Sequence, residues 1–236
     1  MSRQIQHIKT KIYITPFPLP LMKKECSIFL FRHGTTPDNA NGIFSGWRDV
    51  PLNEKGIRDA KIVALRLKNK KIDLAYQSNL LRSKQTLKEV LKPQDFSNLD
   101  GAQEPSARRS RKFLTFHKNV PIITDKRIAE RCYGSLQGRT HLEIIQKYGF
   151  KQYDLWHRGY TNKPPRGESL KDVESRVLPF IRDLLRTIKA RKINVAVSAH
   201  GNSMRALRRY FEKLSIKQMC TLYNDYETVY EYKIKV

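Results

Sequence analysis

The fold of this chain is organised around the stretch Ser27-Ile28-Phe29-Leu30-Phe31-Arg32-His33-Gly34-Thr35-Thr36. Its apolar run is typical of a buried parallel strand, and the run ends abruptly in Arg32-His33-Gly34. In open α/β sheets, ligands bind in the crevice beyond the carboxyl ends of the strands. The stretch therefore predicts an anion site with a nitrogen nucleophile, to which glycine lets the backbone come close. A strand followed by a polar turn is the plain alternative.

A second stretch, Ile193-Asn194-Val195-Ala196-Val197-Ser198-Ala199-His200-Gly201-Asn202, repeats this design. An apolar strand again runs into histidine and glycine, and a helical pattern follows over residues 203–213. Two strand-end histidines, each followed by glycine, are hard to explain as independent core histidines. The sequence therefore predicts that His33 and His200 share one site.

Strand and helix patterns alternate along the rest of the chain. We predict further strands over 72–77, 120–124 and 228–234, and helices over 54–68, 79–91, 140–148 and 170–190. Residues 37–51 are predicted as an irregular loop, and 153–166 as a loop or irregular lid. This alternation predicts right-handed βαβ units, and hence an α/β fold. We expect a single three-layer α/β/α domain with a mostly parallel central sheet, helices on both faces and the last strand at an edge.

Domain boundaries follow from composition. The 236 residues are enough for one domain with a substantial core. We expect a flexible N-terminal extension over 1–26, a catalytic domain over 27–236 and a mobile basic insertion at about 94–119. No apolar run approaches the roughly 20 residues that a membrane span requires.

The chain is strongly basic, with 46 Lys and Arg against 22 Asp and Glu. This surplus indicates an anionic partner, which leaves phosphate substrates, nucleic acid and a membrane surface open. The three cysteines, Cys26, Cys132 and Cys220, show no paired spacing, so we expect a reducing, cytoplasmic compartment. Neither CxxC nor HExxH occurs, and no metal is expected.

The two histidine stretches together resemble the histidine phosphatase superfamily. Three further stretches are similar to its phosphoglycerate mutase branch: Phe44-Ser45-Gly46-Trp47, Glu130-Arg131-Cys132-Tyr133-Gly134 and Glu168-Ser169-Leu170. The likeness covers about residues 27–232 and implies a phosphoglycerate mutase-like fold. It also implies interconversion of 2-phosphoglycerate and 3-phosphoglycerate in glycolysis. The implied intermediate is a phosphohistidine primed by 2,3-bisphosphoglycerate.

Five residues are predicted to carry the chemistry. A histidine nucleophile splits phosphoryl transfer into two steps, and we assign this role to His33. Arg32 and a protonated His200 are placed to hold the phosphate oxygens. Arg82 lies one turn into a helix after a strand end, and by resemblance it completes the phosphate pocket. The resemblance makes Glu130 the acid/base.

The resemblance also implies a set of substrate contacts. These are Thr36, Asn39, Ser45, Gly46, Tyr133, His141, His157, Arg158 and Asn202. Two of them depart from the mutase pattern, because His141 replaces a lysine and His157 replaces the first of two adjacent arginines after Trp156. Histidine is a weaker and pH-dependent cation, so the grip on a second acidic group is in doubt.

Three functions therefore remain in view. The first is a phosphoglycerate mutase, and the second is a histidine phosphatase that hydrolyses small phosphomonoesters. The third is a basic nucleic-acid-binding protein with a relict pocket, which the intact set of five catalytic residues argues against. We expect a small phosphorylated substrate rather than nucleic acid as the partner. The sequence leaves the oligomeric state open, a homo-oligomer included.

Overall fold

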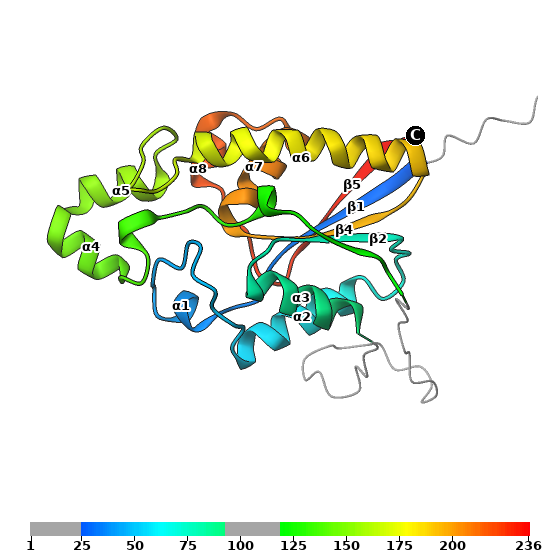
Figure 1. Ribbon diagram of the computed structural model, residues 1–236, viewed down its shortest axis with the longest axis horizontal. Helices are drawn as coiled ribbons and strands as arrows, with labels where there is room; N and C mark the ends of the chain where they lie inside the picture. The colour runs from blue at the N-terminus through cyan, green and yellow to red at the C-terminus, as the bar shows by residue number, and fades with distance from the viewer. Residues whose placement is uncertain (1–24, 93–118) are drawn as a thin grey trace, which may run out of the picture.

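A five-stranded sheet forms the centre of the protein, seen here in a computed structural model that describes residues 25–92 and 119–236 (Figure 1). The strand order is β3-β2-β4-β1-β5, in which neighbours are parallel except for β5, which is antiparallel to β1. The strands are β1 (Glu25–Arg32), β2 (Leu74–Gln77), β3 (Ile122–Thr124), β4 (Val195–Ala199) and β5 (Val229–Lys235). The mostly parallel sheet and its edge strand β5 are confirmed.

Helices cover both faces of this sheet (Figure 1). They are α1 (Pro37–Ala40), α2 (Glu54–Arg66), α3 (Leu81–Leu91), α4 (His141–Tyr148), α5 (Phe150–Arg158), α6 (Leu170–Arg191), α7 (Gly201–Glu212) and α8 (Ile216–Thr221). Helices α6 and α7 lie over one face, and α2 and α3 over the other, while α4 and α5 extend beyond one end of the sheet. The expected three-layer α/β/α arrangement is confirmed.

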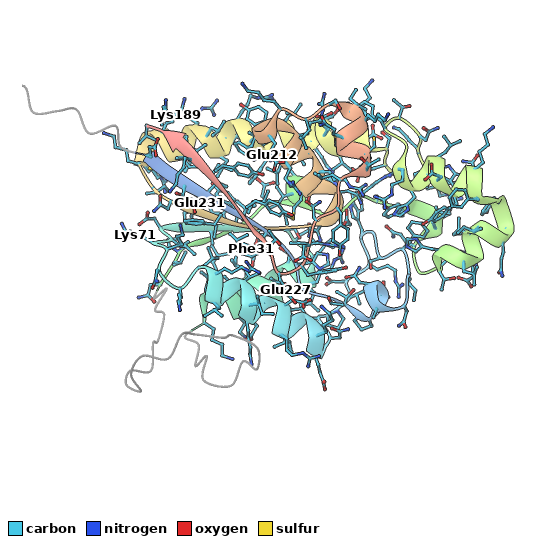
Figure 2. All side chains as sticks on the ribbon, turned by 180° about the vertical axis from the view of Figure 1, so that it is seen from behind. Phe31, Lys71, Lys189, Glu212, Glu227 and Glu231 are labelled. Carbon is cyan, nitrogen blue, oxygen red and sulfur yellow. The ribbon has the colours of Figure 1, made fainter. Side chains whose placement is uncertain are left out.

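Alternation along β1 feeds two separate cores. Ile28 and Leu30 pack with apolar residues of α6 and α7, whereas Phe29 and Phe31 pack with those of α2 and α3. Figure 2 labels Phe31 between the sheet and α2. Successive side chains of a strand point to opposite faces, so a strand buried on both sides reads as one continuous apolar run. This explains why the opening stretch has no polar residue between Ile28 and Phe31.

The predicted helix starts are confirmed where a capping residue marks them. The side chain of Asn53 accepts the Gly56 N–H at 2.8 Å before α2. Ser169 and Asp172 form a reciprocal capping box before α6, the longest helix of the described residues. Side chains of this type satisfy backbone N–H groups that a helix start leaves unpaired.

Three of the predicted boundaries are wrong. The loop predicted over 37–51 contains helix α1, because Thr36 and Asn39 form a capping box and Pro37 occupies the first turn. The first part of the lid predicted over 153–166 belongs to helix α5, which starts after Gly149 at φ +80°, ends at Arg158 and packs against α4, while residues 159–166 are irregular as predicted. Strand β1 begins two residues before the predicted domain, and its Cys26 is buried.

The backbone crosses itself tightly just beyond β1. An added Cβ at Gly34 would lie 2.2 Å from the carbonyl oxygen of Gly56, and one at Gly56 would lie 2.0 Å from that of Thr35. Only glycine fits at such an approach. Because this crossing anchors the start of α2 against the end of β1, it fixes the segment that carries His33.

Two predicted segments lie outside the described residues. These are residues 1–24 of the extension predicted over 1–26, and nearly all of the basic insertion predicted at about 94–119. Within residues 25–92 and 119–236, no helix has both the length and the apolar character that a membrane crossing needs.

Candidate active site

A cavity of about 330 Å³ opens at the carboxyl ends of β1 and β4. All of the predicted site residues line it except Thr36 and His200. The predicted residues that line it are Arg32, His33, Asn39, Ser45, Gly46, Arg82, Glu130, Tyr133, His141, His157, Arg158 and Asn202. The sheet thus brings together side chains separated by up to 170 positions in the sequence.

His33 is held as a neutral ring with one free nitrogen. Its Nδ1 lies 2.7 Å from the carbonyl oxygen of Gly34. A carbonyl oxygen only accepts hydrogen bonds, so Nδ1 carries the ring proton and Nε2 keeps its lone pair. Burial, and then the charges of Arg82 and Arg32, hold the pKa of His33 well below its ordinary value of 6.5. At neutral pH, Nε2 is therefore a nucleophile that needs no prior deprotonation.

His200 lies beside His33, with the two ring centroids 4.9 Å apart. Its Nε2 is 2.7 Å from the hydroxyl oxygen of Ser78, which also accepts the N–H of Leu80. The proton of Ser78 is thus available to Nε2, and the ring proton then resides on Nδ1. Within the described part of the chain, this buried Nδ1 has no hydrogen-bond partner. It is the nitrogen that a bound anion would engage.

The surroundings of His200 disfavour the protonated ring expected from the sequence. Burial lowers the pKa of His200 well below 6.5, and the positive charge of Arg82 lowers it further. A cation next to a guanidinium in a buried site is unfavourable unless an anion offsets it. The hydroxyl of Ser78, which lies just before α3, orients this histidine.

Arg32 is fixed by the segment that precedes β5. Its Nη1 donates to the carbonyl oxygen of Asn224 at 2.9 Å, and its guanidinium carbon lies 3.9 Å from the ring centroid of Tyr226. The buried Nε has no partner among the described residues. Arg32 therefore retains a preorganised N–H for an anion, and its ring contact adds a cation–π interaction.

Arg82 is almost fully buried, at 1% exposure. Its two terminal nitrogens donate to the carbonyl oxygens of Gly46 and Arg48 at 2.7 and 2.9 Å. These bonds fix the plane of the guanidinium, while its buried Nε has no partner in the described chain. A buried cation with an unsatisfied N–H indicates an anionic ligand, because such a group is costly when left unpaired.

Glu130 reaches the same cluster from the segment after β3. Its Oε1 accepts the N–H of Arg131 at 2.7 Å and two bonds from Asn202, through its backbone N at 3.1 Å and its Nδ2 at 2.9 Å. The other oxygen, Oε2, remains for proton transfer to or from a ligand. One carboxylate oxygen is thus used for position and the other for chemistry.

The same cluster has the spacing of a metal site. His33, Glu130 and His200 each offer one ligand atom, and these atoms lie within 4.8 Å of one another. Among the described residues, 25–92 and 119–236, these three are the one group of histidine, cysteine or acidic side chains with such a spacing. The absence of a metal from the reaction stays a prediction.

Thr36 acts through Asn39 rather than on the cavity. It is fully buried, and its hydroxyl donates to Oδ1 of Asn39 at 2.9 Å. This bond leaves the amide nitrogen of Asn39 for a ligand. Ser45 differs, since its hydroxyl oxygen is buried and has no partner among the described residues.

Aromatic and basic residues form the far end of the cavity. The ring of His141 stacks on Phe44 with centroids 4.2 Å apart and an interplanar angle of 5°. His157 approaches Phe44 edge-on, with centroids 5.8 Å apart. The guanidinium of Arg158 lies close enough to lower the pKa values of both histidines. This end therefore combines permanent cations with rings that are neutral at neutral pH.

The sequence prediction missed several lining residues. Arg205 lies on α7 three residues after Asn202, so it shares that residue's face and donates to its Oδ1 at 3.2 Å. Helical spacing could have found it. Tyr223, Asn224 and Tyr226 come from an irregular segment after α8, and no local pattern marks them.

The titration of His33 can be measured directly. We expect the C2 proton resonance of His33 to keep its neutral-form shift from pH 8 down to pH 5, because burial and two arginines disfavour the charged ring. Nuclear magnetic resonance of the free protein checks this, with the resonance assigned by its loss in a His33→Asn variant. A titration midpoint near 6.5 would contradict the assigned environment.

Comparison with known proteins agrees with this geometry. The family model of the histidine phosphatase superfamily (branch 1) matches residues 28–106 and 105–235. The chain is 33% identical over 198 residues to the 2,3-bisphosphoglycerate-dependent phosphoglycerate mutase of Chlamydia trachomatis, covering 83% of this chain and 88% of that protein. It is 36% identical over 201 residues to the mutase of the same name from Methanococcus vannielii, covering 83% and 85%.

Solved structures show the same fold. The alpha-ribazole phosphatase of Shigella flexneri superposes with a TM-score of 0.67 at 21% identity, covering 87% of this chain and 89% of that one. A mycobacterial glucosyl-3-phosphoglycerate phosphatase gives 0.64 at 24% identity, covering 85% and 88%. The family match, the curated relatives and the shared fold lead to one conclusion: the chain belongs to branch 1 of the histidine phosphatase superfamily.

Proposed function

We propose that the protein interconverts 2-phosphoglycerate and 3-phosphoglycerate through a phosphohistidine on His33, primed by 2,3-bisphosphoglycerate. The observation that carries this proposal is the presence of two pairs of arginines in one cavity. Arg32 and Arg82 flank His33, and Arg158 and Arg205 line the same cavity. A substrate with a phosphate and a second acidic group matches this distribution. The names of the curated relatives support the same reaction.

The proposed reaction has two balanced steps. Nε2 of His33 attacks the phosphorus of the primer, so that an N–P bond forms while a P–O bond breaks. The leaving oxygen takes a proton from Glu130. A hydroxyl oxygen of the phosphoglycerate then attacks the phosphohistidine and gives its proton back to Glu130. The arginines and the Nδ1–H of His200 offset charge on the transferred oxygens.

A second candidate is hydrolysis of small phosphomonoesters. It is favoured by the neutral state of His141 and His157, which replace permanent cations of the mutase pattern. Water would then attack the phosphohistidine and release phosphate. Two of the structural neighbours are named phosphatases. Their identity to this chain is under 25%, so the likeness to them shows a shared fold.

Product analysis tests the proposal. The protein is incubated with 3-phosphoglycerate, with and without a trace of 2,3-bisphosphoglycerate, while 2-phosphoglycerate and free phosphate are followed together. We expect isomer formation that requires the trace and outruns phosphate release. A His33→Asn preparation, purified identically, controls for a mutase carried over from the expression host. Free phosphate without isomer would refute the mutase and support the phosphatase.

Location follows from the proposed role. A glycolytic enzyme works in the cytoplasm, and the three free cysteines accord with a reducing compartment there.

A further inference from the structure

One tyrosine hydroxyl joins two histidines at the far end of the cavity. The hydroxyl oxygen of Tyr153 lies 2.8 Å from Nδ1 of His141 and 2.9 Å from Nδ1 of His157. His141 belongs to α4, whereas the other two residues lie one turn apart on α5. Stacking on Phe44 and the edge contact between the histidines, 5.1 Å apart, fix both rings. We call these three residues the His-Tyr-His cluster.

The single hydroxyl proton of Tyr153 makes the two hydrogen bonds of the cluster unequal. A tyrosine hydroxyl has a single proton, so it donates to one Nδ1 and accepts from the other. The histidine that accepts must carry its ring proton on Nε2, and the histidine that donates must have a bare Nε2. Both rings line the cavity, and the hydrogen bonds of the described residues leave both Nε2 atoms without a partner. The neutral cluster therefore presents one N–H donor and one acceptor.

We propose that the His-Tyr-His cluster is a substrate subsite that binds a hydroxyl group when neutral and an acidic group after it gains one proton. A hydroxyl both donates and accepts, which matches the neutral pair of Nε2 atoms. A carboxylate only accepts, so it requires an N–H on both rings. This inference rests on the proposed function in one respect, since phosphoglycerates carry both kinds of group.

The charges around the cluster determine when that proton enters. Burial, and then Arg158 on α5, lower the pKa of His141. Burial, Arg158, the neighbouring His141, Arg205 on α7 and Arg131 lower the pKa of His157 to about 3. Burial raises the pKa of Tyr153, with Tyr133 and Asp154 acting in the same direction and Arg158 against it. The cluster is thus neutral at pH 7.

An acidic ligand changes this balance. Its negative charge offsets the guanidinium of Arg158 and raises the pKa of His141, the histidine whose pKa is lowered less. Binding of the acidic ligand therefore takes up a proton. It weakens as the pH rises, by up to about tenfold per pH unit between the pKa of free His141 and its higher pKa in the complex. Binding of an uncharged hydroxyl has no such dependence.

Calorimetry tests the proton count. The protein carries His33→Asn, so that no ligand is turned over, and binding is measured at pH 7.5 in two buffers of different ionisation enthalpy. We expect 3-phosphoglycerate to take up close to one proton more than glycerol 3-phosphate, whose phosphate group is the same. In a Tyr153→Phe variant, each ring can present Nε2–H independently, so we expect this difference to fall to near zero. Equal proton uptake on binding of the two ligands to the protein that retains Tyr153 would overturn the inference.

A second comparison is independent of phosphoglycerate binding. Glycerol 3-phosphate is expected to bind about threefold to tenfold more tightly than propyl phosphate, which lacks its hydroxyl groups, and Tyr153→Phe should remove this preference. Tyr148→Phe is the matched control, because Tyr148 is exposed and packs edge-on against Trp156. A preference that persists in Tyr153→Phe, or is lost equally in Tyr148→Phe, would overturn the subsite.

The two proposals fail in different ways. If no isomer forms, the proposed mutase function fails, but the difference in proton uptake and the hydroxyl preference still test the subsite. Loss of the subsite, by equal proton uptake and no hydroxyl preference, leaves isomer formation intact.

Discussion

Replacing His33 with asparagine or alanine is expected to lower turnover of any phosphomonoester by about 10⁴-fold or more. The reason is that Nε2 of His33 is the nitrogen nucleophile of the cavity. The hydrogen bond from Nδ1 to the carbonyl oxygen of Gly34 keeps the ring proton on Nδ1, so Nε2 retains its lone pair. Asparagine keeps a donor near that carbonyl oxygen but has no nucleophilic nitrogen. Initial rates with 3-phosphoglycerate and a generic aryl phosphate measure the effect.

The same variants test the covalent step. After incubation with 2,3-bisphosphoglycerate, the protein with His33 should gain the mass of one phosphoryl group, labile in acid and stable in base. Both His33 variants should gain none. Thermal melting provides the folding control, which is needed because His33 is buried and its ring contacts that of His200. Turnover near that of the unaltered protein in a folded His33→Ala variant would refute the nucleophile assignment.

Replacing Gly34 with alanine is expected to lower the free energy of unfolding by about 3 kcal/mol or more. The added methyl group would lie 2.2 Å from the carbonyl oxygen of Gly56 and 2.8 Å from its carbonyl carbon. Both are backbone atoms that cannot rotate away, so α2 or the end of β1 must shift. Urea denaturation followed by circular dichroism measures the loss.

Gly201→Ala is the matched control for this substitution. Gly201 also follows a strand-end histidine, but its added methyl group would meet Oε2 of Glu130 at an ordinary 3.5 Å. It lies in the first turn of α7, where alanine favours the helix, so the free energy of unfolding should change by less than about 1 kcal/mol. Equal losses at the two positions would show that the crossing of Gly34 and Gly56 is not what makes glycine necessary.

The two histidine-glycine steps also show how far sequence reasoning reaches. Both histidines were placed correctly at neighbouring strand ends, because apolar runs that end in polar residues are a local signal. The packing requirement for glycine is real at Gly34 and absent at Gly201, and only the position of Gly56 decides between them. Contacts between distant segments leave no mark in either tripeptide.

The far end of the cavity was predicted less well for a related reason. The segment around Tyr153 was expected to be an irregular lid, although Tyr153, Trp156 and His157 have the spacing of one helix face. The role of Tyr153 depends on His141 from another helix. Similarly, the charge of His200 depends on burial and on Arg82, and neither is visible in the residues next to it.

The position of β1 in the sheet has a consequence for the order in which the protein matures during synthesis. This strand is made early, yet its two neighbours, β4 and β5, are the last two strands along the chain. The carbonyl oxygen and the ring that hold Arg32 come from residues 224 and 226, and Glu227, labelled in Figure 2, lies beside them. A ribosome therefore has to translate some 200 residues after His33 before the phosphate end of the site is complete. Until then the nascent chain carries His33 beside an Arg32 side chain that nothing yet holds in place. Folding of the site must wait for these long-range contacts.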